Sequence, residues 1–196
     1  MKILAAFILL FGSVLLLGCD NSNDPAPPPT GHVKVFVSSQ TFAGSSLRGL
    51  DGADEFCRRA ADAQGQTGTW TAWLSDNTAN AVDRILDSGG RPYQTIDGTV
   101  VANDIADLTD GTLAAAIVID EMGNTVSSDF DVWSATDTDG TYKGQGTCVN
   151  WDDSSPGLVA GIGIAGQTDA TWTNAGGGQS CDTFNRIYCF ADAGSQ

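Results

Sequence analysis

The chain has 196 residues, of which 41% are hydrophobic, and this is enough for one domain of roughly 150 residues with extensions at its ends. Aspartate and glutamate number 24 against 9 lysines and arginines, which gives a net charge of −15. This balance excludes a nucleic-acid-binding protein, because no basic stripe is available to displace counterions from phosphates. The single histidine, His32, leaves no second histidine for a zinc site and little basis for histidine catalysis.

The first residues have the pattern of an export signal. Lys2 is followed by an apolar run over residues 3–17, which is too short and wrongly flanked for a membrane span. The run ends in LLGC, which resembles the bacterial lipoprotein box. In that family the signal is cut before the cysteine, which then carries acyl chains such as palmitate. The resemblance therefore implies a signal peptide over residues 1–18 and a lipid anchor on Cys19.

The segment after this cysteine is predicted to be a tether. Residues 20–31, DNSNDPAPPPTG, contain four prolines and no apolar periodicity, which is typical of a partly extended linker. The sequence thus divides into a lipidated tether over 19–31, a folded domain over 32–192 and a short tail over 193–196. We expect the protein in the bacterial cell envelope, bound to the membrane through its lipid anchor and either periplasmic or surface-exposed.

The folded domain begins with a strand pattern and a helix pattern. Apolar and polar residues alternate in VKVFVSS from Val33, which predicts a strand. Residues 50–65, LDGADEFCRRAADAQG, predict a helix with Asp51 as its N-cap and Gly65 as its stop. The apolar residues of this helix recur at helical spacing, and Cys57 is among them. Cys57 is therefore expected to face the core.

The remainder of the domain changes from helix patterns to strand patterns. WTAWLSD, residues 70–76, predicts a short aromatic strand, and NAVDRILDSGG, residues 80–90, predicts a second helix that ends at Gly89. The strand-like runs that follow are TVVANDIADL, AAAIVIDEMG, DVWSATD, TCVNWDD and RIYCFAD. Two helices near the front with strands behind them predict an α+β domain.

The four cysteines of the domain are predicted to form two disulfides. Export places their thiols in an oxidising compartment, where such pairs persist. Cys148 and Cys181 flank a loop-rich stretch, whereas Cys57 and Cys189 lie near opposite ends of the domain. The residues alone leave all three connectivities open.

Four motifs in order give the domain a family resemblance. They are GLDGADEFC, WTAWLSD, CVNW, and WTN followed by SCDTFNRIYCF. Over residues 33–191 the chain resembles a bacterial lipoprotein domain of unknown function with an endostatin-like, C-type lectin-like fold. The resemblance implies two helices packed on short antiparallel strands, a loop-rich second half, and neighbouring first and last strands. It also implies nested disulfides, Cys57 with Cys189 and Cys148 with Cys181.

Catalytic motifs are weak in this sequence, and the protein is not expected to be an enzyme. GGRP and AGGGQSC are glycine-rich, but neither joins a strand to a helix in a phosphate-binding pattern. No G-x-S-x-G motif is present. Enzymes on lectin-like folds, such as formylglycine-generating oxidases, depend on reactive cysteines. The cysteines of this domain are all expected to be in disulfides.

Calcium is the one cofactor that the sequence offers. Sugar-binding C-type lectins carry a Glu-Pro-Asn or Gln-Pro-Asp triplet and a Trp-Asn-Asp triplet, and this chain departs from both patterns. DTDG, residues 137–140, is similar to the start of an EF-hand loop but lacks the glutamate at the twelfth place. An irregular oxygen-ligand site is the remaining alternative, and its candidate ligands are Asp137, Asp139, Asp152 and Asp153.

The candidate ligand-binding residues lie in the loop-rich segment 137–174. Trp151 and Trp172 stand among Asp, Ser, Thr and Asn, so they are expected to be the most exposed of the five tryptophans, with Asn174 beside them. The favoured function is a membrane-anchored recognition domain that binds a glycan or a protein partner through these loops. The alternatives are a structural envelope lipoprotein without a soluble ligand and, third, an enzyme on a lectin-like fold.

Overall fold

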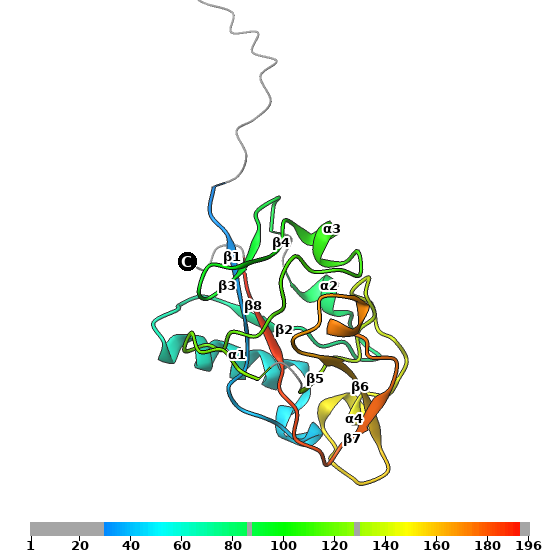
Figure 1. Ribbon diagram of the computed structural model, residues 1–196. Helices are drawn as coiled ribbons and strands as arrows, with labels where there is room; N and C mark the ends of the chain where they lie inside the picture. Colours follow the sequence, from blue (N-terminus) through cyan, green and yellow to red (C-terminus); the bar gives the residue numbers. More distant parts are fainter. Residues whose placement is uncertain (1–29, 86–87, 128–129, 193–196) are drawn as a thin grey trace, which may run out of the picture.

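The computed structural model describes residues 30–85, 88–127 and 130–192 (Figure 1). These residues form an α+β domain with two sheets, one long helix and several short helical turns. In the part of the chain described, no helix is both long enough and apolar enough to cross a membrane. Two disulfides join its four cysteines, as expected for a protein folded in an oxidising, exported environment.

The larger sheet has five strands in the order β2-β8-β1-β3-β4. Its strands are β1 (Val33–Val37), β2 (Trp70–Ala72), β3 (Tyr93–Thr95), β4 (Val100–Ala102) and β8 (Tyr188–Ala191). The first and last strands of the domain, β1 and β8, lie side by side and antiparallel, as the resemblance implies. The resemblance implies strands that are all antiparallel, and this is wrong for one pair, because β1 and β3 run parallel.

The smaller sheet has three antiparallel strands in the order β5-β6-β7. They are β5 (Asp131–Trp133), β6 (Val159–Ile164) and β7 (Gly178–Ser180). A parallel bridge from Val132 to Arg186 connects this sheet to the segment that leads into β8. The two sheets thereby share one core, which contains all five tryptophans.

The long helix α1 (Gly49–Ala63) confirms the helix predicted over residues 50–65. Gly65, with a φ of 72°, ends it: the Gly65 and Gln66 amides donate to the Asp62 and Ala61 carbonyls, both at 3.0 Å. The predicted N-cap is wrong, because Asp51 lies within the first turn and the N-cap is Arg48 in the left-handed region. Asp51 makes no cap because the chain already enters the helix at Gly49.

The other helical elements are one turn each, and they replace several predicted elements. They are η1 (Gly44–Leu47), α2 (Ala81–Arg84), α3 (Ile105–Leu108), α4 (Cys148–Trp151) and η2 (Ala170–Trp172). The second predicted helix ends after Arg84 because Ile85 is extended. Its residues 86–87 lie outside the described part of the chain.

Three predicted strand runs also need correction. TVVANDIADL forms β4 and then α3, because Asp104 accepts a hydrogen bond from the Asp107 amide and caps a helical turn. AAAIVIDEMG contributes only an isolated bridge, Ile119 with Thr125. TCVNWDD forms the helical turn α4. In each case a local turn is stabilised by capping or tertiary contacts that override the strand propensity of the apolar residues.

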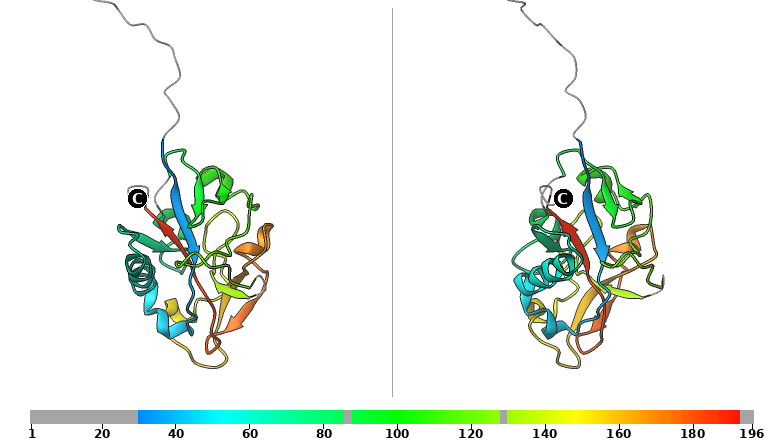
Figure 2. Two further views of the ribbon diagram at one scale, coloured as in Figure 1. Left: turned by 60° about the vertical axis from the view of Figure 1, so that its left-hand side comes forward. Right: turned by 90° about the vertical axis from the view of Figure 1, so that its left-hand side faces the viewer.

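The disulfides are Cys57–Cys189 and Cys148–Cys181, which is the nested pairing that the resemblance implies. The first joins the buried face of α1 to β8, and confirms that Cys57 faces the core. The described chain begins and ends at one end of the domain, while η1 and α4 lie toward the other end (Figures 1 and 2). The Cys148–Cys181 bridge is located in this distal region.

Candidate functional site

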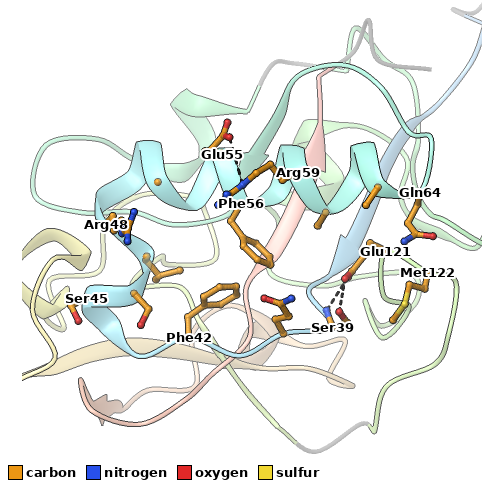
Figure 3. A pocket seen from close by; sticks show the side chains of 16 residues that line it. Ser39, Phe42, Ser45, Arg48, Glu55, Phe56, Arg59, Gln64, Glu121 and Met122 are labelled. Carbon is orange, nitrogen blue, oxygen red and sulfur yellow. Dashed lines mark hydrogen bonds and ion pairs between the residues drawn. The ribbon is translucent and has the colours of Figure 1, made fainter.

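A groove of about 1010 Å³ runs along α1. One wall is α1, the other is the chain over residues 39–48 that includes η1, and a turn at Glu121 lies at one end (Figure 3). We call it the α1 groove. It is lined by Ser39, Gln40, Phe42, Ser45, Ser46, Leu47, Arg48, Gly52, Glu55, Phe56, Arg59, Ala60, Ala63, Gln64, Glu121 and Met122.

The floor of the α1 groove is a pair of phenylalanines. The rings of Phe42 and Phe56 meet edge to face, with centroids 4.3 Å apart at 74°. Phe42 is held by its backbone, which exchanges hydrogen bonds with Asn185 at 2.8 and 3.1 Å. Its carbonyl also accepts a hydrogen bond from the Trp133 indole at 2.7 Å. The floor is therefore fixed to the core of the domain.

The corner between η1 and α1 depends on glycine and on left-handed backbone. Arg48 and Gly49 have φ values of 57° and 77°, and together they turn the chain from η1 into α1. A Cβ on Gly52 would lie 2.2 Å from the Leu47 carbonyl oxygen. Only glycine at this position lets η1 approach α1 so closely, so the motif RGLDG sets the shape of this end of the groove.

The η1 wall is fastened to the distal disulfide region. The Gly44 amide donates to the Cys181 carbonyl at 2.9 Å, and the Ser45 amide donates to Ser154 Oγ at 2.7 Å. A Cβ on Gly44 would lie 2.7 Å from the Cβ of Cys148. The Cys148–Cys181 bridge therefore packs directly against the wall of the α1 groove.

The helical turn that carries this bridge is left-handed. Residues 148–151 have φ values of 51°, 54°, 55° and 64°, a conformation that costs free energy for every non-glycine residue. Surrounding contacts hold it: the Asn150 amide donates to Thr147 Oγ1 at 3.0 Å, and the Trp151 indole donates to the Ser75 carbonyl at 3.1 Å. The Thr147 cap, the hydrogen bond from the Trp151 indole and the Cys148–Cys181 disulfide thus hold the turn that supports η1.

The charged side chains of the α1 groove differ in whether they have a partner of opposite charge. Glu55 accepts two hydrogen bonds from Arg58, at 2.9 and 2.7 Å, and lies 3.5 Å from Arg59. Glu121 accepts from the Ser39 amide at 2.8 Å and from the Ser39 hydroxyl. Arg48 is exposed and is the one Lys or Arg side chain in the described residues without a hydrogen bond or ion pair.

The predicted ligand-binding tryptophans are not at the surface. Trp151 and Trp172 are both fully buried, so their predicted exposure is wrong. The Trp151 indole packs on Trp133, and the Trp172 indole packs on Trp73 and Tyr188. Asn174 is part of the loop scaffold: it donates to Asp137 at 2.8 Å.

The four aspartates proposed as calcium ligands do not come together as a site. Within residues 30–85, 88–127 and 130–192, no three His, Cys, Asp or Glu side chains are placed to hold a metal ion. Asp139 accepts from the Thr141 amide at 3.0 Å and Asp153 from the Ser155 amide at 2.6 Å, so each stabilises its own turn. The hydrogen bond from Lys143 holds the pKa of Asp137 below its usual value. Asp152 follows Trp151 as the C-cap of α4.

No known protein family matches the chain, and no characterised protein matches it in sequence. Cys19, the predicted lipidation site, lies outside the described residues. The α1 groove is not predicted from the sequence, because the helical spacing of the apolar residues of α1 indicates a core-facing side only. The signal that could have found it is Phe56 with Ala60 and Ala63, which extends the apolar face of the helix beyond the buried residues.

Proposed function

We propose that the chain is an exported, lipid-anchored recognition protein that binds a protein partner in the α1 groove. The observation that carries this proposal is the combination of an aromatic floor, Phe42 with Phe56, and the unpaired guanidinium of Arg48 in one groove. Aromatic and arginine side chains are the residues that most often supply binding energy in protein interfaces. The exposed Met122 at the far end adds an adaptable apolar contact.

A protein partner is favoured over a glycan because of where the aromatic rings lie. Sugar recognition commonly uses an exposed indole or phenol ring, which has an apolar face and a polar edge. All five tryptophans are at most 2% exposed, and Tyr93 and Tyr188 are buried. Tyr142 is partly exposed but does not line the groove. The groove presents phenylalanine and methionine, which suit apolar side chains of a polypeptide.

The proposed fold is C-type lectin-like, with the endostatin-like arrangement that the sequence resembles. Two features support this proposal: the first and last strands of the domain are paired, and the two disulfides are nested. Loops on such a scaffold would carry recognition, and η1 with residues 39–48 is a segment of this kind.

Lipid anchoring at Cys19 is proposed from the lipoprotein-box resemblance, and the paired cysteines of the domain support export. The described chain begins at the end of the domain opposite η1 (Figures 1 and 2). Metabolic labelling with an alkyne fatty acid tests the anchor. Cys19→Ser should abolish labelling and leave a precursor that retains its signal, whereas equal labelling of both proteins would refute lipidation.

Binding in the groove is tested by a matched pair of phenylalanine substitutions. Phe56→Ser removes half of the aromatic floor, and Phe184→Ser removes a ring that is 67% exposed and does not line the groove. Envelope proteins recovered with the tagged full chain should be lost with Phe56→Ser and kept with Phe184→Ser. If neither substitution changes the recovered set, the alternative of a structural lipoprotein without a groove ligand is favoured.

A further inference from the structure

We propose that the partner enters the α1 groove as an extended peptide segment of about five residues, with a carboxylate at one end, an apolar side chain in the middle and a basic group at the other end. This inference rests on the proposed function and specifies the chemistry of the partner. The length of the groove and the order of the groups along it support this chemistry.

The length of the groove follows from α1. Gly52 and Gln64 both line it, and the distance along the helix between them is about 18 Å at 1.5 Å per residue. An extended chain advances about 3.3 Å per residue, so about five residues span this length. Phe42 and Phe56 lie between Arg48 on one side and Glu121 on the other (Figure 3).

The carboxylate end is assigned by Arg48. Every other described lysine and arginine side chain donates to a carboxylate, an amide oxygen or a carbonyl, whereas the Arg48 guanidinium has no hydrogen-bond or ion-pair partner among the described residues. Its left-handed backbone fixes its place at the corner of η1 and α1. An unpaired guanidinium at the mouth of a groove favours a carboxylate, because the two groups can form a bidentate pair.

The neighbouring Glu55 does not cancel this preference. Its carboxylate accepts hydrogen bonds from Nε and Nη2 of Arg58. The Nε atom of Arg59 lies 3.5 Å from the same carboxylate. The negative charge of Glu55 is thus matched before a ligand arrives, while the positive charge of Arg48 is not.

The basic end is assigned by Glu121. The residue Glu121 is 8% exposed. The described partners of its carboxylate are the amide and hydroxyl of Ser39, which carry no charge. No described cation forms an ion pair with it. A lysine, an arginine or a free amino group of the partner would complete this end of the groove.

The test is a double-mutant cycle between the full chain and synthetic peptides. The probe is the fluorescein-labelled, amidated peptide KGFGD, and its affinity is measured by fluorescence anisotropy against the detergent-solubilised full chain. We expect Asp→Asn in the peptide and Arg48→Gln in the protein each to weaken binding about five- to tenfold. Combined, they should weaken it no more than either change alone. Lys→Gln in the peptide should be coupled to Glu121→Gln in the same way.

Two controls separate this inference from the proposed function. Phe→Ala in the peptide should weaken binding to the wild-type chain and have little further effect on Phe56→Ser, because both remove the same contact. If the peptide binds but the Asp and Arg48 changes are independent, the assigned charge order is wrong and groove binding stands. If the labelled peptide does not bind at all, the inference is refuted, and the envelope recovery experiment with Phe56→Ser still decides the proposed function.

Discussion

Removal of the distal disulfide should destabilise the domain and loosen the wall of the α1 groove. The Cys148→Ala, Cys181→Ala variant opens a loop with a sequence separation of 33. The chain-entropy relation gives about 3.7 kcal/mol as the upper limit of the stabilisation lost. The left-handed turn at Cys148 also loses one of its supports, and Gly44 and Ser45 of η1 are fastened to this region. We therefore expect a loss of about 2–4 kcal/mol in the free energy of unfolding.

Two assays measure this effect. Urea denaturation gives the free energy of unfolding, and limited trypsin digestion gives the rate of cleavage after Arg48, which follows η1 directly. In the variant we expect cleavage after Arg48 to accelerate under conditions where the domain stays folded, because η1 opens locally.

The matched control is the Cys57→Ala, Cys189→Ala variant. It opens a loop with a sequence separation of 132, for which the same relation gives about 5 kcal/mol. Its bridge joins α1 to β8, whereas the hydrogen bonds that fasten η1 run to Cys181 and Ser154. We expect this variant to have a lower free energy of unfolding than the wild type. Its cleavage after Arg48 should not accelerate under conditions where the domain stays folded. If the distal pair costs less than about 1 kcal/mol, or if both variants are cleaved after Arg48 with the same selectivity, the Cys148–Cys181 bridge does not hold the η1 wall.

Three further substitutions test separate parts of the structure. The pKa of Asp137 is lowered by Lys143, so its ionised form stabilises the fold above the unfolded pKa and this stability is lost as pH falls through the folded-state pKa. Melting temperatures between about pH 5 and pH 2 should therefore fall less steeply for Asp137→Asn than for the wild type. Trp151→Phe removes the buried hydrogen bond to the Ser75 carbonyl and should cost about 1–3 kcal/mol in urea denaturation, whereas an exposed indole would cost less than about 0.5 kcal/mol. Gly52→Ala should destabilise by about 1–3 kcal/mol in the same assay, because its Cβ meets the Leu47 carbonyl and this clash outweighs the helix propensity of alanine.

The elements that could be predicted from sequence are those with local, periodic signals. The strand from Val33 and the helix that ends at Gly65 have clear periods and a left-handed glycine stop, and both are present. The α+β class follows from their order. The prediction of a second helix over residues 80–90 is wrong beyond its first turn. Arg84 donates to the carbonyls of Ala72 and Leu74, which holds this single turn against β2, and Ile85 then continues as extended chain.

The candidate site could not be predicted because it depends on contacts between distant segments. Trp151 and Trp172 have polar neighbours in sequence, yet the fold buries both indoles against other aromatic rings. The left-handed turn at residues 148–151 has no local signal, since three of its residues are Cys, Val and Trp, which disfavour this conformation. It forms through the disulfide, Thr147 and Ser75, and so the η1 wall that rests on it was also unforeseen.

Binding of a protein partner in the α1 groove can be measured by site-specific photo-cross-linking in intact cells. A photo-reactive amino acid replaces Ser46, an exposed residue in the groove, and in a control chain it replaces Thr99, an exposed residue in the turn between β3 and β4. After irradiation we predict a discrete protein adduct at position 46 that disappears when Phe56→Ser is added and is missing at position 99. No adduct at position 46, or the same adducts at both positions, would show that the α1 groove does not bind a specific protein partner.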